Sequence, residues 1–212
     1  MTESPSGRDG PALRSCLAQD LDRYRDFVRG EIKEGRANPR RLLGYAFCAF
    51  GLYATAAYRL RRAALVRRAG APLLARAPLG LAELAARLLQ HATETLYDIR
   101  IDPEADIGPG LYIGHFGGVY IGRCRLGRSC AVHQQAKLGA PRLTGPVIGD
   151  HVWIGPHARV APEARVGDGA TILSGALVDS DIPPRALAGG APARIIRRDY
   201  DNGPLMRFYA DD

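Results

Sequence analysis

An aliphatic residue recurs at every sixth position through most of the second half of the chain. A period of six matches neither the 3.6-residue repeat of a helix nor the two-residue repeat of an ordinary strand. It is typical of a β-helix, in which three short strands and three tight turns make each coil of a triangular prism. We therefore expect stacked aliphatic side chains inside such a prism, at Ile101, Ile107, Ile113, Leu126, Val132, Leu138, Ile148, Ile154, Val160, Val166, Ile172 and Val178.

Two interruptions break this register. Between Ile113 and Ile121 the spacing is eight, and the extra residues fall within the glycine-rich segment 114–118. The second interruption makes residues 139–147 a predicted loop outside the prism. Insertions in a solenoid form surface loops, often on its binding face. Both interruptions therefore indicate where a functional site should be sought.

The remaining segments define the domain organisation. Residues 1–13 are polar and predicted to be disordered, and helical spacing predicts a helical domain over 14–96. The period changes near Ile99, so the β-helix domain is predicted to span 97–198, followed by a polar tail over 199–212. The predicted fold is an N-terminal all-α region followed by a parallel β-helix.

Two local patterns refine the helical domain. Ser15 is a suitable N-cap for the first helix. A later helix is predicted over 79–90, with leucines along one side at Leu81, Leu84, Leu88 and Leu89.

The stretch from Leu42 to Tyr58 has no charged residue. A spanning helix needs about 20 apolar residues, and this stretch is slightly short and diluted with small residues. We expect a helix that is buried in a helical bundle or in a subunit contact. An open alternative is peripheral contact of residues 42–68 with the inner face of the membrane, assisted by the arginines that follow Tyr58.

The net charge of +7 comes almost entirely from arginine, because Lys33 and Lys137 are the only lysines. This excess favours acidic partners such as phosphorylated cofactors, although GC-rich codon usage gives the same balance. No arginine run is interleaved with aromatic residues, so no nucleic-acid partner is expected. The four cysteines lack C-x-x-C spacing and the N-terminus lacks the pattern of a signal peptide, so we expect a cytoplasmic protein with reduced thiols.

Several segments together resemble the serine O-acetyltransferases and the related O-acetyltransferases of bacterial surface polysaccharides. They are 58–60 (YRL), 99–103 (IRIDP), 110–119 (GLYIGHFGGV), 133–139 (HQQAKLG) and 192–196 (PARII). The histidine segment together with PARII is far more specific than the hexapeptide repeat alone. The resemblance implies a left-handed β-helix, assembly as a homotrimer or a dimer of trimers, and acetyl-CoA bound between neighbouring prisms.

The resemblance also implies that His115 is the general base. A neutral imidazole suits this role because its unperturbed pKa is about 6.5. Gly114, Gly117 and Gly118 surround it and leave room for two substrates. Asp102, Asp98 and Asp106 are candidates to orient the imidazole, and an ordinary solvated turn aspartate is the alternative for each.

Further site residues follow from the same resemblance. On the acceptor side the candidates are Asp102, His133 and Arg142. The cofactor candidates are small residues of the pantetheine groove and arginines that could meet the phosphates, namely Gly139, Ala158, Gly175, Arg194, Arg197 and Arg198. Simple packing of His133 and a solvated strand edge for the arginines remain open alternatives.

The chain departs from serine acetyltransferases where those enzymes hold serine. Arg100 occupies the position of an aspartate that helps to orient the base, and Gly114 replaces a second aspartate. Thr144 and Gly145 occupy the place of an Arg-His pair in the long loop. These differences favour an acetyl-CoA-dependent O-acetyltransferase whose acceptor is a sugar or another small alcohol. The alternative within the family is a true L-serine O-acetyltransferase of cysteine biosynthesis.

Two readings from other classes remain open. β-Helix carbonic anhydrases bind zinc through three histidines, and His115, His151 and His157 have nearly the required separations. Both His151 and His157 stand in common turn contexts, so we expect no metal. A catalytically silent scaffold is the other reading, and it requires that His115 be dispensable.

Overall fold

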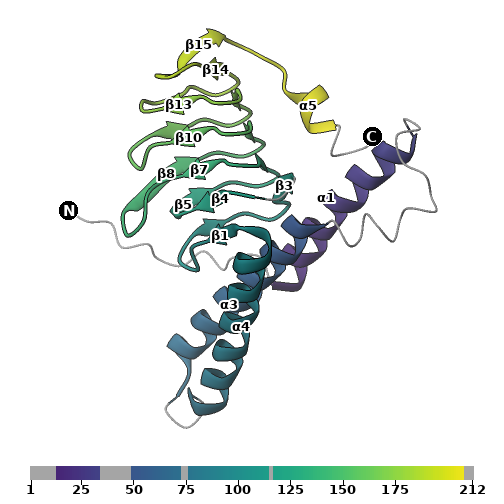
Figure 1. Ribbon diagram of the computed structural model, residues 1–212, viewed down its shortest axis with the longest axis vertical. Coiled ribbons are helices and arrows are strands. Elements are labelled where there is room, and N and C mark those ends of the chain that lie inside the picture. Colours follow the sequence, from purple (N-terminus) through teal and green to yellow (C-terminus); the bar gives the residue numbers. More distant parts are fainter. Residues whose placement is uncertain (1–12, 34–48, 73–75, 115–116, 208–212) are drawn as a thin grey trace.

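The computed structural model describes residues 13–33, 49–72, 76–114 and 117–207. Three long helices come first: α1 (Leu13–Lys33), α3 (Phe50–Gly70) and α4 (Arg76–Tyr97). A stack of short strands follows, and a short helix, α5 (Gly203–Arg207), lies beside the stack (Figure 1).

The strands form three parallel sheets, one for each face of a left-handed β-helix, which confirms the predicted fold. Sheet A consists of β1 (Ile99–Ile101), β4 (Val119–Ile121), β7 (Lys137–Leu138), β10 (Arg159–Val160) and β13 (Leu177–Val178). Sheet B consists of β2 (Asp106–Ile107), β5 (Arg123–Leu126), β8 (Thr144–Ile148) and β11 (Arg165–Val166). Sheet C consists of β3 (Tyr112–Gly114), β6 (Ala131–His133), β9 (Trp153–Ile154), β12 (Thr171–Ile172), β14 (Leu187–Gly189) and β15 (Arg194–Arg197), and β15 runs antiparallel to β14.

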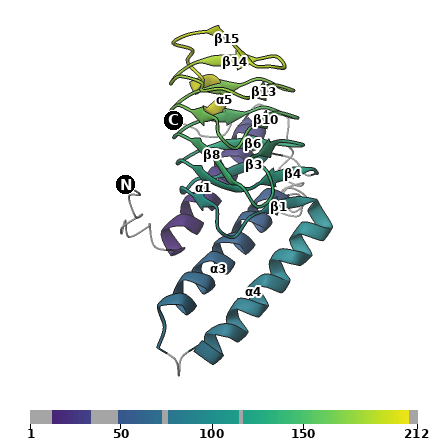
Figure 2. The same cartoon turned by 90° about the vertical axis from the view of Figure 1, so that its left-hand side faces the viewer.

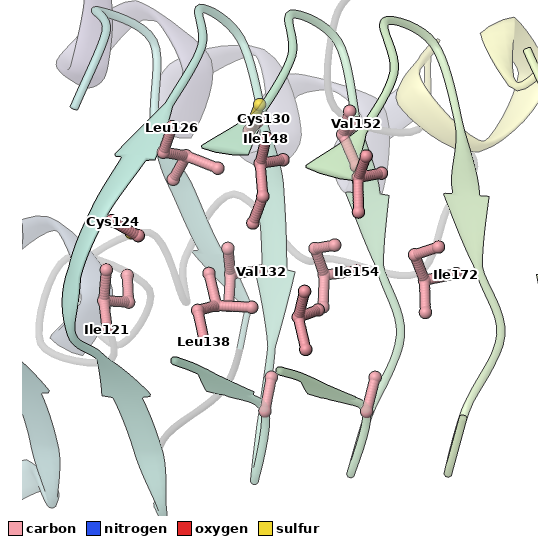
Figure 3. Close-up of a cluster of buried hydrophobic side chains, with 14 of the residues drawn as sticks. Ile121, Cys124, Leu126, Cys130, Val132, Leu138, Ile148, Val152, Ile154 and Ile172 are labelled. Carbon is pink, nitrogen blue, oxygen red and sulfur yellow. The ribbon is translucent and has the colours of Figure 1, made fainter. Parts of the chain in front are cut away.

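The predicted aliphatic positions all lie inside the prism, where each side chain is at most 5% exposed. Figure 3 shows Leu126, Val132, Leu138, Ile148 and Ile154 stacked along its axis. A second ladder of mostly small residues stands two positions before these aliphatic residues and fills the corners, as at Ala105, Cys124, Cys130, Ala136, Ala158, Ala164, Ala170 and Ala176. Burying one aliphatic side chain stabilises a fold by about 1.5–3 kcal/mol, so this repeat is the main source of cohesion.

The helical region packs on the first coil of the prism. The buried face of α3 includes Gly51, Ala54 and Tyr58. Tyr58 Oη donates a hydrogen bond to the Ala105 carbonyl oxygen at 2.7 Å, which ties this helix to the turn before β2. Helix α4 packs along α3, and the pair projects beyond the first coil (Figure 2).

Two predicted details of the helices are wrong. Helix α1 begins at Leu13, so Ser15 lies within its first turn, and its hydroxyl accepts a bond from Gln19 Nε2 instead of capping the helix. Helix α4 extends from Arg76 to Tyr97 and is longer than the predicted 79–90. Pro78 is compatible with this longer helix because proline is tolerated in a first turn.

The uncharged stretch is only partly described, since residues 42–48 lie outside the described residues. Its remainder forms the start of α3, whose buried residues contact the prism, in agreement with the predicted buried helix. Among the described residues no helix combines the length and apolar character needed to cross a bilayer.

Two segments of the second half differ from expectation. The loop predicted over 139–147 is shorter, because β8 begins at Thr144 and pairs with β5. Part of the predicted tail is ordered, since Met206 is buried in a cluster with Tyr24 and Tyr112, and Asn202 Nδ2 donates to the His151 carbonyl oxygen at 2.9 Å.

Candidate active site

The corner that joins sheet C to sheet A, here called the C–A corner, carries the glycine-rich insertion. His115 and Phe116 lie outside the described residues, so the predicted base itself has no described geometry. The residues on both sides are described: Gly114 ends β3 and Gly117 precedes β4.

Hydrogen bonds hold the two glycines that follow Phe116. Gly117 N donates to the Tyr97 carbonyl oxygen at 3.1 Å, and Gly118 N donates to Asp98 Oδ2 at 2.8 Å. Gly117 and Gly118 have φ values of +99° and +70°, a region that favours glycine. A Cβ on Gly118 would also collide with the Gln135 amide. The conformation at the end of the insertion therefore requires glycine.

Helix α1 fixes the strand that leads into the insertion. The Tyr24 hydroxyl accepts a hydrogen bond from Ile113 N at 2.9 Å and donates one to the Ile113 carbonyl oxygen at 3.1 Å. Burial raises the pKa of this phenol well above its usual range, so the hydroxyl keeps its proton. A Cβ on Gly51 would overlap this pair of groups, so α3 also needs a glycine here.

The turns along the C–A corner are stacked by hydrogen bonds. Gln135 N donates to the Gly117 carbonyl oxygen and His157 N to that of Gln134, each at 3.0 Å. Gly175 N continues the chain with a bond of 2.8 Å to the Pro156 carbonyl oxygen. Gly175 has a φ of +71° and open space where a side chain would stand. The turns of successive coils thus form one continuous hydrogen-bonded edge of the prism.

His133 is buried beside the insertion. Its Nδ1 lies 3.0 Å from the Ile154 carbonyl oxygen, which can only accept, so Nδ1 carries the proton. The ring packs against Trp153, with ring centroids 4.6 Å apart, and borders the Cα of Gly114. Packing at the edge of the site is its clearest role.

Three predicted site residues lie instead at the A–B corner, which joins sheet A to sheet B. Asp102 accepts bonds from Glu104 N at 2.9 Å and Arg123 Nε at 3.4 Å. Arg142 is exposed with a φ of +64°, and Gly139 has a φ of +78°. An open groove of about 430 Å³ lies next to them, lined by Leu143, Thr144, Gly145, Val147, Pro162, Glu163, Ala164 and Arg165. Within one chain this corner and the C–A corner are at opposite ends of the strands of sheet A.

The three carboxylates proposed to orient the base lie in different parts of the prism. Asp98 bonds the insertion through Gly118, whereas Asp102 is at the A–B corner. Asp106 is in sheet B, where its carboxylate lies 3.6 Å from Arg62. Among these three aspartates, Asp98 is the one next to the insertion.

The cofactor candidates occupy different environments. Ala158 is fully buried, so its methyl group faces the core, and only its backbone borders the corner. Arg194, Arg197 and Arg198 are exposed at the last coil, on or just after β15. Arg194 Nη1 donates to the Ala193 carbonyl oxygen at 3.0 Å, and the Arg197 guanidinium lies over the Tyr200 ring.

The histidines of the zinc reading do not converge within one chain. His151 precedes β9 and His157 follows it, so they lie at opposite ends of that strand. The described residues contain no group of three metal-binding side chains.

One feature was missed from the sequence, namely the outward-facing positions of sheet A. Arg100 pairs with Tyr120, Tyr120 with Lys137, and Lys137 with Arg159. We call these four residues the sheet A column. Each of the four stands one position before a buried aliphatic residue of sheet A. The residue before each aliphatic position of the repeat would therefore have indicated the column.

Known proteins share this architecture and parts of this sequence. Residues 145–180 match the family model "Bacterial transferase hexapeptide (six repeats)". The serine acetyltransferase of Mycobacterium tuberculosis is 33% identical over 178 residues, which cover 80% of this chain and 72% of that protein. The serine acetyltransferase of Staphylococcus xylosus is 33% identical over 54% of this chain, and the matched part spans only 55% of that relative.

Solved structures agree. Soybean serine acetyltransferase in complex with serine is 28% identical, with a TM-score of 0.65 over 88% of this chain and 70% of that one. The Vibrio cholerae serine acetyltransferase, at 24% identity, has the same fold, with a TM-score of 0.69 over 92% of this chain and 70% of that one. The extent of the M. tuberculosis match, the three-sided prism and the glycine-flanked insertion lead to one conclusion: the chain belongs to the serine acetyltransferase-like family of hexapeptide-repeat acyltransferases.

Proposed function

We propose that the protein is an acetyl-CoA-dependent O-acetyltransferase with His115 as general base. The acceptor oxygen attacks the thioester carbonyl carbon while the imidazole takes the hydroxyl proton. The C–S bond then breaks and CoA leaves as a thiolate, which needs little assistance because a free thiol has a pKa of about 8.5. The observation that carries the proposal is the fixed backbone on both sides of His115, held at Gly117 and Gly118 after it and by the Tyr24 contact to Ile113 before it.

The cofactor groove is proposed to follow the C–A corner. Gly175 offers open space beside a stacked edge of backbone, and Ala158 borders the same edge. Arg194, Arg197 and Arg198 would meet the phosphates at the last coil, because a guanidinium binds phosphate through paired hydrogen bonds.

We further propose that the active unit is a homotrimer. Gly139, Arg142 and the groove beside them lie at the A–B corner, away from the insertion. A neighbouring prism that presents its A–B corner to this C–A corner would unite the two sets in a repeated heterologous contact. Helix α4 exposes Leu81, Leu84 and Leu88 by 71%, 51% and 61%, and this surface is suited to joining two trimers. Sedimentation equilibrium tests both assemblies.

For the acceptor we favour a sugar or another small alcohol, since Thr144 and Gly145 stand where the family has a serine-binding pair. L-Serine is the second candidate, because the relatives described above are serine acetyltransferases. The cytoplasm is the proposed compartment, and the buried free thiols of Cys124 and Cys130 are compatible with reducing conditions.

The test is release of CoA thiol from acetyl-CoA in the presence of serine, homoserine and sugar acceptors. His115→Ala should lower kcat by about 10²- to 10⁴-fold, the usual contribution of a general base. His91→Ala is the matched control, since His91 is exposed on α4 and lies about 9 Å of helix before Tyr97, the residue that contacts Gly117. Full transfer by the His115→Ala variant would contradict the assignment and favour a silent scaffold.

A further inference from the structure

The chain that follows β15 turns back along the outside of sheet C. We call residues 199–207, which end in α5, the C-terminal strap. Tyr200 N donates to the Arg185 carbonyl oxygen at 2.7 Å, and Asn202 Nδ2 donates to the His151 carbonyl oxygen at 2.9 Å. Figure 1 shows the descent of this segment from β15 to α5. The strap is therefore bonded to two different coils of the prism.

The end of the strap packs on the strand that leads into the insertion. Met206 is 7% exposed and lies in a cluster with Tyr24 of α1, Tyr112 of β3 and Ala131 of β6. The ring centroids of Tyr24 and Tyr112 are 5.0 Å apart. A thioether packs well against aromatic rings because it is polarisable and adapts its shape. The strap thus carries contacts from the last coil to the first.

A short chain of contacts connects Met206 to the residue before His115. A Cβ on Gly114 would stand 3.0 Å from Tyr112 Cε1 and 3.1 Å from His133 Cδ2, so both rings lie against the Gly114 backbone. Gly114 directly precedes His115 in the chain. A shift of the Tyr112 ring would therefore change the support of the backbone from which the insertion starts.

The strap can be released without loss of the prism. Met206 belongs to a cluster that is separate from the aliphatic core of the coils. Its other two contacts, at Tyr200 and Asn202, are single hydrogen bonds, and the exposed residues Asp201 and Pro204 stand between the anchors. A segment with few buried contacts opens locally more readily than the core of a fold. Weakening the strap should therefore loosen β3 while the β-helix stays folded.

We propose that the C-terminal strap positions the glycine-rich insertion for acetyl transfer and that Met206, acting through Tyr112, is a positioning residue. The inference rests on the proposed O-acetyltransferase function. A general base must lie within hydrogen-bond reach of the proton that it removes. A displacement of about 1 Å, caused by a change far from the chemistry, can lower a rate by about a hundredfold. The strap supplies no reacting group and acts on the geometry of β3.

The kinetic test compares Met206→Ala with Leu205→Ala, a matched control because Leu205 is the preceding residue of α5, is half-exposed and lies outside the cluster. CoA release is followed with the serine, homoserine and sugar acceptors, at a temperature at which circular dichroism shows every variant to be folded. Met206→Ala should lower kcat by about tenfold or more and leave the KM for acetyl-CoA within about twofold. Met206→Leu should restore most of kcat, since it conserves apolar volume. Leu205→Ala should behave like the wild-type protein.

Amide hydrogen exchange gives a readout that does not need turnover. Ile113 N donates to the Tyr24 hydroxyl at 2.9 Å, and its exchange should accelerate by about tenfold or more in Met206→Ala. Gly110 N, which Asp20 holds at 2.8 Å, should change by less than about threefold. Asn202→Asp is a second way to release the strap, because it removes the donor and turns a carboxylate toward the His151 carbonyl oxygen. It should change kcat and the exchange of Ile113 in the same direction.

Unchanged kcat in the folded Met206→Ala and Asn202→Asp variants would overturn the inference, and so would unchanged exchange of Ile113. An equal loss of kcat in Leu205→Ala would also overturn it. A raised KM for acetyl-CoA at unchanged kcat would assign the strap to cofactor binding and contradict the positioning role. Absence of CoA release by the wild-type protein with every acceptor would instead refute the proposed function, and the exchange of Ile113 would still decide whether the strap holds β3.

Discussion

The attachment of α1 to the first coil depends on one buried carboxylate. Asp20 Oδ1 accepts hydrogen bonds from Gly110 N at 2.8 Å and Leu111 N at 3.0 Å, and Oδ2 accepts one from Arg59 Nε at 3.0 Å. Asp20 is fully buried and Arg59 is only 5% exposed. The Arg59 guanidinium also donates to the carbonyl oxygens of Ile107 and Gly108. The ion pair of Asp20 and Arg59 therefore joins α1, α3 and the first coil.

Asp20→Asn should weaken this centre severely. The asparagine carbonyl can still accept the two backbone N–H groups, but its NH₂ group then faces the guanidinium and leaves a buried cation unpaired. Removing one partner of a buried ion pair costs about 3–5 kcal/mol. Replacing the exposed Asp22, which lies 3.5 Å from Arg25 with both side chains more than half exposed, should change stability by less than about 1 kcal/mol.

Amide hydrogen exchange reads this attachment directly. The amides of Gly110 and Leu111 should lose about a hundredfold or more of their protection in Asp20→Asn, because a loss of 3 kcal/mol corresponds to roughly that factor. The amides of the last coils should change much less, because the hydrogen bonds of Asp20 go to the first coil and to α3. Unaltered exchange at Gly110 and Leu111, or an equal loss in Asp22→Asn, would refute the reasoning.

Two further predictions concern the same junction. Gly51→Ala should destabilise the protein by about 1–3 kcal/mol in chemical denaturation, because the added methyl group overlaps Tyr24 Oη and the Ile113 carbonyl oxygen; Gly80→Ala, which meets no atom closer than 3.9 Å, should instead be neutral or stabilising. Burial raises the pKa of Tyr58 from 10 to about 12. Because the unfolded chain ionises this phenol first, the contribution of Tyr58 to stability should be intact below pH 10 and fall by about 2–3 kcal/mol as the pH rises toward 12. Tyr58→Phe should flatten this slope, and an equal slope in that variant would contradict the assignment.

The β-helix could be predicted because its information is local and repeated. Each coil places an aliphatic residue inside the prism at a fixed spacing, so Ile148, Ile154 and Val160 predict their own burial without knowledge of any distant residue. The insertion at 114–118 was visible as a break in that spacing for the same reason. The broken register at 139–147 was a weaker guide, since pairing of β8 with β5 draws Thr144 to Val147 into a sheet.

The candidate site could be predicted only in part. A shared motif indicates His115, but it does not tell which aspartate accompanies it: Asp98, Asp102 and Asp106 are close in sequence, yet the coil sends them to different corners or faces. The sheet A column could not be predicted for the opposite reason, because its residues are distant in sequence and close in space. Arg100, Lys137 and Arg159 are far apart in the chain, and parallel pairing alone brings them onto one face.

The sequence by itself determined the three-sided prism and the position of the insertion along it. Each buried aliphatic residue packs against the aliphatic residues of the adjacent coils, and these stand at the same fixed spacing in the sequence. Only the tertiary structure decided how α1 and α3 hold the strand before the insertion, through contacts such as Asp20 with Gly110 and Tyr24 with Ile113, which join residues about 90 positions apart. Such contacts depend on the geometry of two assembled surfaces, and no local pattern in either segment encodes its distant partner.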